Sequence, residues 1–137
     1  MTKKIKLLYF INTLKPFGGA EVALSNIISY LESENVEIWV GILFDKQDEE
    51  VAISLPQERV VYFNFKPKYY TDINAIRRLS KFIKQQGFDV VHTHLYASNF
   101  VGRIAAWMAG AKAIIISEHN TYVKRANKLN TIDRLLA

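Results

Sequence analysis

The fold of this 137-residue chain is decided by residues 5–21, which read IKLLYFINTLKPFGGAE. Residues 5–11 are an apolar run typical of a buried strand, and the run stops at Asn12. A short loop then leads to Gly18 and Gly19, which precede a helical pattern. The apolar positions expected on its buried face are Ala20, Leu24, Ile27, Ile28 and Leu31. The stretch therefore predicts a strand, a tight glycine turn and an amphipathic helix, the first unit of an α/β domain.

The glycine pair predicts an anion-binding turn. Gly18 and Gly19 have no Cβ, so a ligand can approach their backbone closely. The free N–H groups and the dipole of the following helix favour negative charge there, and a diphosphate is the expected ligand. The alternative is that the pair only turns the chain into the helix, and the pair alone does not decide between the two.

Composition restricts the class of protein. Half of the residues are hydrophobic and mean hydropathy is near zero, which excludes a disordered chain and a membrane-spanning one. The apolar start meets Lys15-Pro16 without a small-residue cleavage site, so it is interpreted as a strand and the cytoplasm is the expected location. Because the chain has no cysteine, disulfides, thiolate catalysis and cysteine-based zinc sites are excluded.

Strands and helices alternate along the rest of the chain. Further strands are expected at residues 36–44, 60–65, 88–92 and 113–117, and further helices at 72–86 and 97–108. Thr71 or Asp72 is expected to cap the second helix, with Ile73, Ile76, Leu79 and Ile83 facing inward. The inward residues of the third are Ala97, Val101, Ile104, Ala105 and Met108. The pattern predicts a Rossmann-like open parallel sheet of about five or more strands with helices on both faces.

The chain is expected to form one domain over residues 1–137. Residues 131–136 begin a helical pattern and the sequence stops there, so the domain is expected to be truncated near its C-terminal end. The missing helix between the second and third strands is the irregular feature. Residues 46–56 fill that interval and are polar, acidic and ended by Pro56, which indicates a surface excursion with one short helical turn.

Polar residues gather where the strands end, and in open α/β sheets ligands bind at that edge. They are Asn12, Asp45, residues 66–70, His92-Thr93-His94 and Glu118-His119-Asn120, and they include all three histidines of the chain. The histidines have three possible roles. His92 and His94 could be metal ligands, with His119 or Glu118 completing the set. The histidines could also be bases or hydrogen-bond donors to a substrate, or loop residues with internal partners. Residue spacing leaves these three roles open.

Three motifs in this order resemble the N-terminal domain of GT-B glycosyltransferases of family 4. They are Gly18-Gly19-Ala20-Glu21, then residues 88–94 (FDVVHTH) leading into a helix with Gly102 to Ala106, and Ser117-Glu118-His119-Asn120. The resemblance spans nearly the whole chain. It implies retaining transfer of a sugar from a nucleotide-diphosphate donor to a glycan or lipid-linked acceptor, in a cleft between two Rossmann-like domains. A role in cell-surface polysaccharide synthesis is expected, without an essential metal or cofactor.

The resemblance also implies roles for individual residues. Gly18 and Gly19 would approach the donor diphosphate, and His119 would be the catalytic residue, donating a hydrogen bond beside the reacting sugar. Glu21 would orient the glycine loop. The residues expected to line the acceptor or sugar are Asn12, His94, Glu118 and Asn120. Because the family holds its donor nucleotide mainly with a C-terminal domain that this sequence does not contain, the 137-residue chain alone is expected to be inactive.

The net charge is +5, and its distribution suggests acidic partners. A basic face on the second helix would suit an anionic membrane at the inner surface of the cell or a lipid-diphosphate acceptor, although a solvated basic face is the alternative. This face consists of Arg77, Arg78, Lys81 and Lys84, close to residues 66–70. Nucleic acid is not expected, since neither a helix-turn-helix pattern nor a stacking aromatic motif is present.

A second hypothesis is a non-catalytic nucleotide- or dinucleotide-binding module. Asp45, at the end of the second strand, stands where such a module places its ribose-binding acid. However, the three-glycine fingerprint is missing, because only Gly18 and Gly19 occur in the turn.

Overall fold

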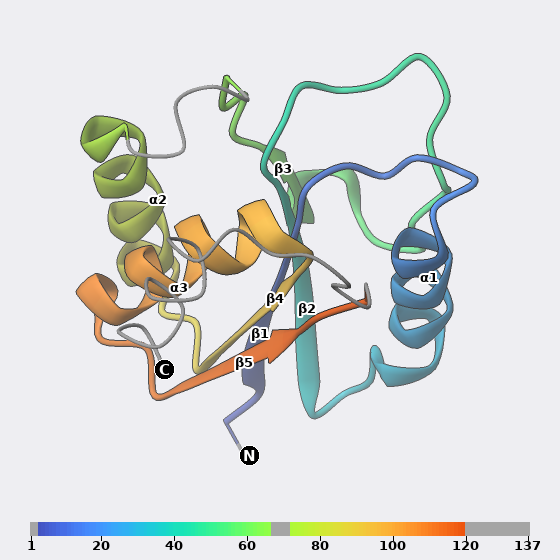
Figure 1. Cartoon of the computed structure of the whole chain (residues 1–137). Coiled ribbons are helices and arrows are strands. Elements are labelled where there is room, and N and C mark those ends of the chain that lie inside the picture. Colours follow the sequence, from blue (N-terminus) through green and yellow to red (C-terminus); the bar gives the residue numbers. More distant parts are fainter. Residues whose placement is uncertain (1–2, 67–71, 120–137) are drawn as a thin grey trace.

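A computed structural model describes residues 3–66 and 72–119 and has a five-stranded parallel sheet of order β3-β2-β1-β4-β5 (Figure 1). This confirms the Rossmann-like α/β class. The strands are β1 (Ile5–Ile11), β2 (Val36–Ile42), β3 (Val60–Tyr62), β4 (Val90–His94) and β5 (Ala113–Ser117). The helices are α1 (Gly19–Leu31), α2 (Ile73–Gln86), α3 (Tyr96–Ala109) and a 3-10 turn, η1 (Gln57–Arg59).

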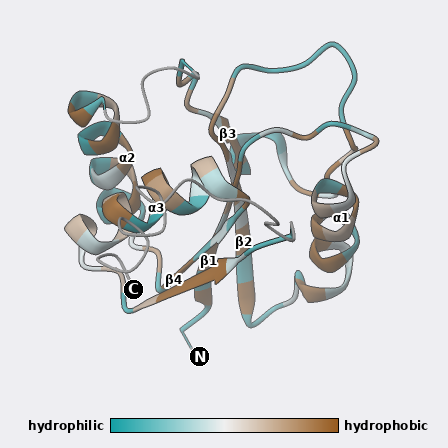
Figure 2. Cartoon of the chain, viewed as in Figure 1, coloured by the Kyte–Doolittle hydropathy of each residue, from teal (hydrophilic) through white to brown (hydrophobic). Residues whose placement is uncertain are grey.

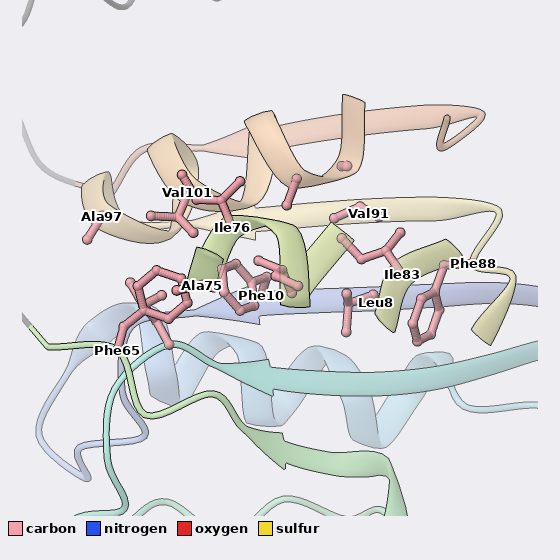
Figure 3. Close-up of a cluster of buried hydrophobic side chains, with 14 residues drawn as sticks. Leu8, Phe10, Phe65, Ala75, Ile76, Ile83, Phe88, Val91, Ala97 and Val101 are labelled. Carbon is pink, nitrogen blue, oxygen red and sulfur yellow. The ribbon is translucent and has the colours of Figure 1, made fainter. Parts of the chain in front are cut away.

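Helices cover both faces of the sheet, α1 on one side and α2 with α3 on the other (Figure 1). Because successive side chains of a strand point to opposite faces, β1 supplies both cores. Leu8 and Phe10 pack with α2 and α3 (Figure 3), whereas Tyr9 and Ile11 pack with α1. Burying a side chain such as Phe10 contributes on the order of 2 kcal/mol, so the β1 sequence stabilises both layers.

Phe10 lies in a narrow slot between two glycines. A Cβ on Gly41 of β2 would stand 2.8 Å from the Phe10 ring, and a Cβ on Gly102 of α3 would stand 2.7 Å from it. A side chain at either position would therefore force the ring or the backbone to move. The absence of side chains there lets α3 approach the sheet closely, which places the start of α3 beside the ends of β1 and β4.

Several predicted strand boundaries were wrong by two or three residues, and some helix positions predicted to be buried were wrong. β2 ends at Ile42 and β3 at Tyr62, each two or three residues earlier than predicted. Shortly after β3, Asn64 adopts the left-handed conformation, with a φ of 55°. β4 begins and ends two residues later than predicted, so His92 and His94 belong to the strand itself. The predicted short helical turn lies just after residues 46–56, at η1. Four side chains that were predicted to be buried are exposed, namely Ile27, Leu31, Ile73 and Met108.

The α2 cap was predicted in part correctly. The Asp72 carboxylate accepts hydrogen bonds from the N–H groups of Asn74 and Ala75, 3.0 and 3.2 Å away, which satisfies two donors of the first turn. Gly87 and Gly110 end α2 and α3 in the left-handed conformation. Thr71, the other predicted cap, and the expected helix at 131–136 lie outside the described residues.

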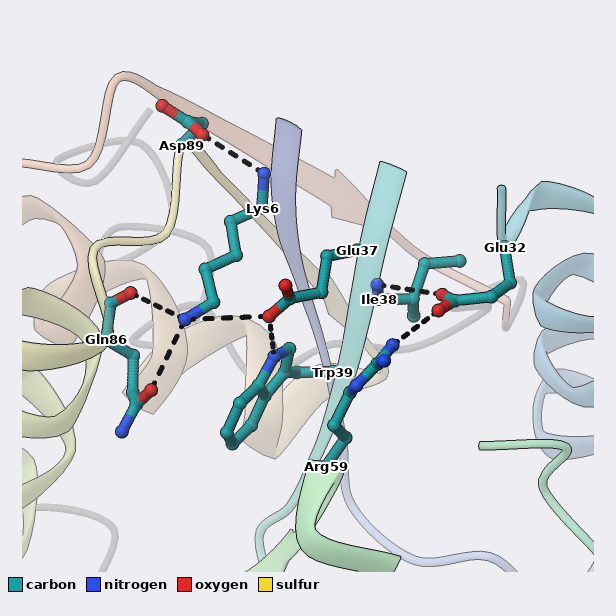
Figure 4. A network of polar contacts seen from close by, with 8 residues as sticks. All are labelled: Lys6, Glu32, Glu37, Ile38, Trp39, Arg59, Gln86 and Asp89. Carbon is teal, nitrogen blue, oxygen red and sulfur yellow. Dashed lines mark hydrogen bonds and ion pairs between the residues drawn. The ribbon is translucent and has the colours of Figure 1, made fainter. Parts of the chain in front are cut away.

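The amino ends of the strands are held by polar contacts (Figure 4). Asp89, just before β4, accepts from the Lys6 backbone N–H at 3.0 Å and pairs with Lys112 at 2.6 Å. The Lys6 side chain lies between the Gln86 carbonyl and Glu37 (Figure 4). In contrast, the loop that follows β2 is hydrophilic through much of its length (Figure 2). The polar groups at the amino edge are therefore engaged in structural contacts, and the polar loops lie at the carboxyl edge.

Candidate functional site at the carboxyl ends of the strands

The glycine turn starts α1, with Gly18 as its N-cap and Gly19 as its first residue. Space beside Gly18 is filled by the Glu21 carboxylate, because a Cβ there would lie 1.9 Å from Glu21 Oε2. Glu21 is buried and accepts a hydrogen bond from the Thr13 hydroxyl at 3.2 Å. Beside Gly19, a Cβ would meet no atom within 4 Å. Gly19 is thus the open half of the turn, and Glu21 packs inside the loop as expected for a residue that orients it.

A cavity of about 520 Å³ opens next to this turn, beyond the ends of β1, β2 and β3. Its size is within the range of small-molecule sites. It carries two carboxylates, from Glu21 and Asp45, and one ammonium group, from Lys15, beside the rings of Phe44 and Phe65. The remaining lining residues are Asn12, Thr13, Gln47 and Leu95. Hydroxyl-rich molecules suit such a wall of carboxylates, amides and aromatic rings.

Asn12 joins β1 to the start of α3. Its side-chain oxygen accepts two hydrogen bonds from Ser98, one from the backbone N–H at 2.9 Å and one from the hydroxyl at 2.7 Å. β1 and β4 are neighbours at the point where the strand order reverses, and ligands bind at such switch points. Asn12 therefore fixes the α3 N-terminus against the edge of the cavity that it lines.

The three histidines form one column of rings. His92 and His94 lie on the same face of β4, with ring centroids 4.2 Å apart, and His119 stacks on His94 at 5.2 Å. His94 Nδ1 and His119 Nε2 are 2.9 Å apart, at hydrogen-bond distance. His92 Nε2 makes a 2.8 Å contact with the Ser117 hydroxyl, and Tyr9 flanks both β4 rings.

Burial increases along this column toward His94. His94 is only 3% exposed, whereas His119 is exposed at the surface. Burial, together with the neighbouring His92 and His119 rings, lowers the pKa of His94 to about 3. Burial and His119 also lower the pKa of His92. At neutral pH the His94 ring is therefore uncharged.

The segment after β5 is held by α3. Asn99, buried in the first turns of α3, donates to the Ser117 carbonyl at 3.2 Å and to Glu118 Oε1 at 2.8 Å. Between β4 and α3, Leu95 adopts φ 70° and ψ 157°, a conformation rarely used by residues other than glycine. Its N–H donates to the Ser117 carbonyl at 3.2 Å. The Glu118-His119 segment thus has a fixed attachment to β4 and α3.

Apart from the glycine pair of the turn, the described site residues fall into two groups. Asn12 and Asp45 line the cavity, and His94, Glu118 and His119 belong to the column and its attachment. Asn120 and residues 67–71 lie outside the described residues. Within residues 3–66 and 72–119, no cluster of three potential ligands is arranged to hold a metal ion.

Sequence reasoning missed the supporting polar residues. Thr13, Ser98, Asn99 and Ser117 each hold a predicted site residue by a hydrogen bond. Small polar residues next to helix starts are usually capping residues, so their types carried no separate signal. Thr13 stands just after the predicted first strand, which could have identified it. Ser98 and Asn99 lie in the first turn of a predicted helix and Ser117 is the last residue of a predicted strand, so the carboxyl edge of the sheet was their only signal.

The fold and site together define a Rossmann-like domain with a polar ligand edge at a topological switch point. The chain belongs to glycosyltransferase family 4, whose family model matches residues 17–136, and it has the N-terminal domain of the GT-B fold. A lipopolysaccharide outer core galactosyltransferase, WaaB, in its apo form superposes with a TM-score of 0.65 over 93% of this chain. At 20% identity this likeness supports the fold alone, and it covers 37% of that chain.

A relative from Escherichia coli is 35% identical over 48 residues. It is the UDP-Gal:alpha-D-GlcNAc-diphosphoundecaprenol alpha-1,3-galactosyltransferase, and the match covers 35% of this chain and 12% of the relative. The chain therefore spans well under two thirds of either protein.

Proposed function

We propose that this domain forms the acceptor side of a retaining hexosyltransferase that uses a nucleotide-diphosphate sugar. The observation that carries the proposal is the exposed His119 at the carboxyl edge of a family 4 domain, held by the buried His94 at 2.9 Å. An exposed imidazole on a rigid support is suited to donating a hydrogen bond as charge develops on a reacting sugar. We expect this chemistry to need no metal or other cofactor.

The donor and the acceptor would bind on opposite sides of the glycine turn, with their reacting groups close together. The open approach at Gly19 and the α1 N-terminus favour the donor diphosphate there. The neighbouring cavity suits the acceptor, since its carboxylates can accept hydrogen bonds from sugar hydroxyls. The exposed Asp45 carboxylate disfavours a phosphate in the cavity, so for a lipid-linked glycan we place the sugar in the cavity and the lipid diphosphate outside it.

The proposed setting is cell-surface polysaccharide synthesis at the inner face of the membrane. We infer peripheral contact through the exposed basic residues of α2, which are Arg77, Arg78, Lys81 and Lys84. No helix within the described residues is long and apolar enough to cross a bilayer. Since the family's donor nucleotide is held mainly by a C-terminal domain, we infer that the 137-residue chain alone does not turn over.

The test is release of nucleoside diphosphate by the full-length gene product and by its His119→Ala variant. The panel of nucleotide sugars begins with UDP-galactose, because both relatives carry galactosyltransferase names. We expect the full-length product to turn over in the presence of a chelator. His119→Ala should lower kcat by about 100-fold or more with folding intact. The isolated 137-residue chain should show no turnover. Full activity of His119→Ala would overturn the assignment of His119.

A non-catalytic binding module remains the second candidate, because Asp45 lies in the cavity where a ribose could bind. The two candidate functions differ in their ligand. If the full-length product consumes no nucleotide sugar but binds a dinucleotide with an affinity that Asp45→Asn reduces, the function is that of a binding module and not of a transferase.

A further inference from the structure

His94 and His119 share one hydrogen bond, between His94 Nδ1 and His119 Nε2, 2.9 Å apart. A neutral imidazole has one N–H and one bare nitrogen, so one ring must donate and the other accept. The tautomer of the buried ring therefore decides the tautomer of the exposed one.

The direction of the bond follows from the second nitrogen of His94. Nε2 of this residue is buried, and no described residue provides it with a hydrogen-bond partner. A proton on Nε2 would be a buried donor without an acceptor, and proteins leave buried acceptors unpaired more readily than buried N–H groups. The proton of His94 is therefore assigned to Nδ1, which donates to Nε2 of His119.

The His94 ring is also prevented from turning over. It is stacked between His92, 4.2 Å away, and His119, and the Tyr9 ring lies 5.5 Å from it. His92 is itself anchored to the Ser117 hydroxyl, and Asn99 holds the Ser117 carbonyl. Both rings of the shared bond therefore have fixed positions.

We propose that His94 is a positioning residue that holds His119 in the Nδ1–H tautomer, so that His119 presents an N–H donor to a ligand oxygen. This rests on the proposed function only in the identity of that oxygen, which would belong to the sugar under transfer. An unconstrained histidine in water prefers the Nε2–H tautomer. The Nδ1–H tautomer of His119 would therefore be evidence of a constraint from the protein, because solvent alone favours the other tautomer.

The test is nitrogen-15 NMR of the imidazole groups in the 137-residue chain near pH 7.5. Three histidines give three spin systems, and the protonated nitrogen of each ring is recognised by its chemical shift. In the wild type we expect His119 with its proton on Nδ1. His94→Asn should preserve this form, because the asparagine amide nitrogen stands close to the position of the histidine Nδ1. His94→Leu should shift His119 to the Nε2–H form, and so should His94→Asp, which offers an acceptor in place of the donor.

The matched control is His92→Asn, which changes the neighbouring ring of the same strand and should leave the His119 tautomer unchanged. Wild-type His119 in the Nε2–H form, or a tautomer insensitive to His94→Leu and His94→Asp, would overturn the proposal. In the full-length enzyme, His94→Asn should keep a higher kcat than His94→Leu at a similar KM. Absence of any transferase activity would refute the proposed function without affecting the tautomer result, so the two failures are distinguishable.

Discussion

At the scale of single residues, the two glycines of the turn have separate tasks. Gly18 makes room for the Glu21 carboxylate, whereas Gly19 has open space beside it. We expect Gly18→Ala to displace Glu21 from Thr13 and to lower the free energy of unfolding by about 1 kcal/mol, since a buried hydrogen-bonded carboxylate is disturbed. Gly19→Ala should leave stability unchanged or slightly raised, because alanine favours the helix. Urea denaturation of the two variants measures both effects.

Kinetics of the proposed full-length transferase then distinguish an anion-binding glycine pair from one that only turns the chain. Gly19→Ala should raise KM for the nucleotide sugar several-fold, because its methyl group projects into the open approach. A variant with unchanged KM would mean that the pair only turns the chain into the helix. Gly18→Ala with full stability and Glu21 in place would contradict the packing described for the loop.

At the scale of elements, Asp89 joins three strands at the amino edge of the sheet. Its carboxylate accepts from the β1 backbone at Lys6 and contacts the side chains of Lys3 and Lys112. The hydrogen bond from Lys112, followed by that from the Lys6 N–H, lowers the pKa of Asp89 to about 2. The native state therefore binds its proton less tightly than the unfolded chain, whose aspartates have an ordinary pKa near 3.8.

The stabilising effect of Asp89 should thus be complete above about pH 5 and should disappear as the pH falls toward 2. We expect Asp89→Ala to lose about 1–2 kcal/mol at pH 7, mostly from the Lys6 bond, because both lysine side chains are exposed to screening solvent. The difference from wild type should shrink in acid denaturation curves. Asp48→Asn, an exposed acid in the loop after β2, is the control. An Asp89→Ala deficit that stays constant from pH 7 to 2 would contradict the charge-based explanation.

The elements also indicate which features a single sequence can predict. Because parallel strands end at one edge, residue order was sufficient to place Asn12, Asp45, His94 and His119 there. The stacking of the histidines was not predictable, because the sequence gives no register between β4 and β5. Ile73 and Met108 were assigned to the core because helical periodicity marks a face but not where a helix end projects beyond the sheet.

At the scale of the whole molecule, the charge is concentrated in one layer. Helices α2 and α3 contain five basic residues and no acidic one. The chain has 18 basic and 13 acidic residues, and the excess of five equals the number of basic residues in these two helices. Trp107 of α3 is 75% exposed in the same layer, and tryptophan is enriched at membrane interfaces. The basic residues and the exposed tryptophan are the observations from which we infer contact with an anionic bilayer.

We therefore expect the chain to co-sediment with vesicles that contain anionic phospholipid and not with purely zwitterionic ones. Lys81→Gln with Lys84→Gln should weaken partitioning about 30-fold, because each near-surface base contributes on the order of 1 kcal/mol. The charge-matched control is Lys4→Gln with Lys46→Gln, two exposed lysines outside this layer, which should bind nearly as wild type does. Binding should also fall as salt is added, since counterions screen the attraction. Equal loss in both double variants would mean that net charge alone acts, and binding that ignores lipid charge would exclude α2 as the contact surface.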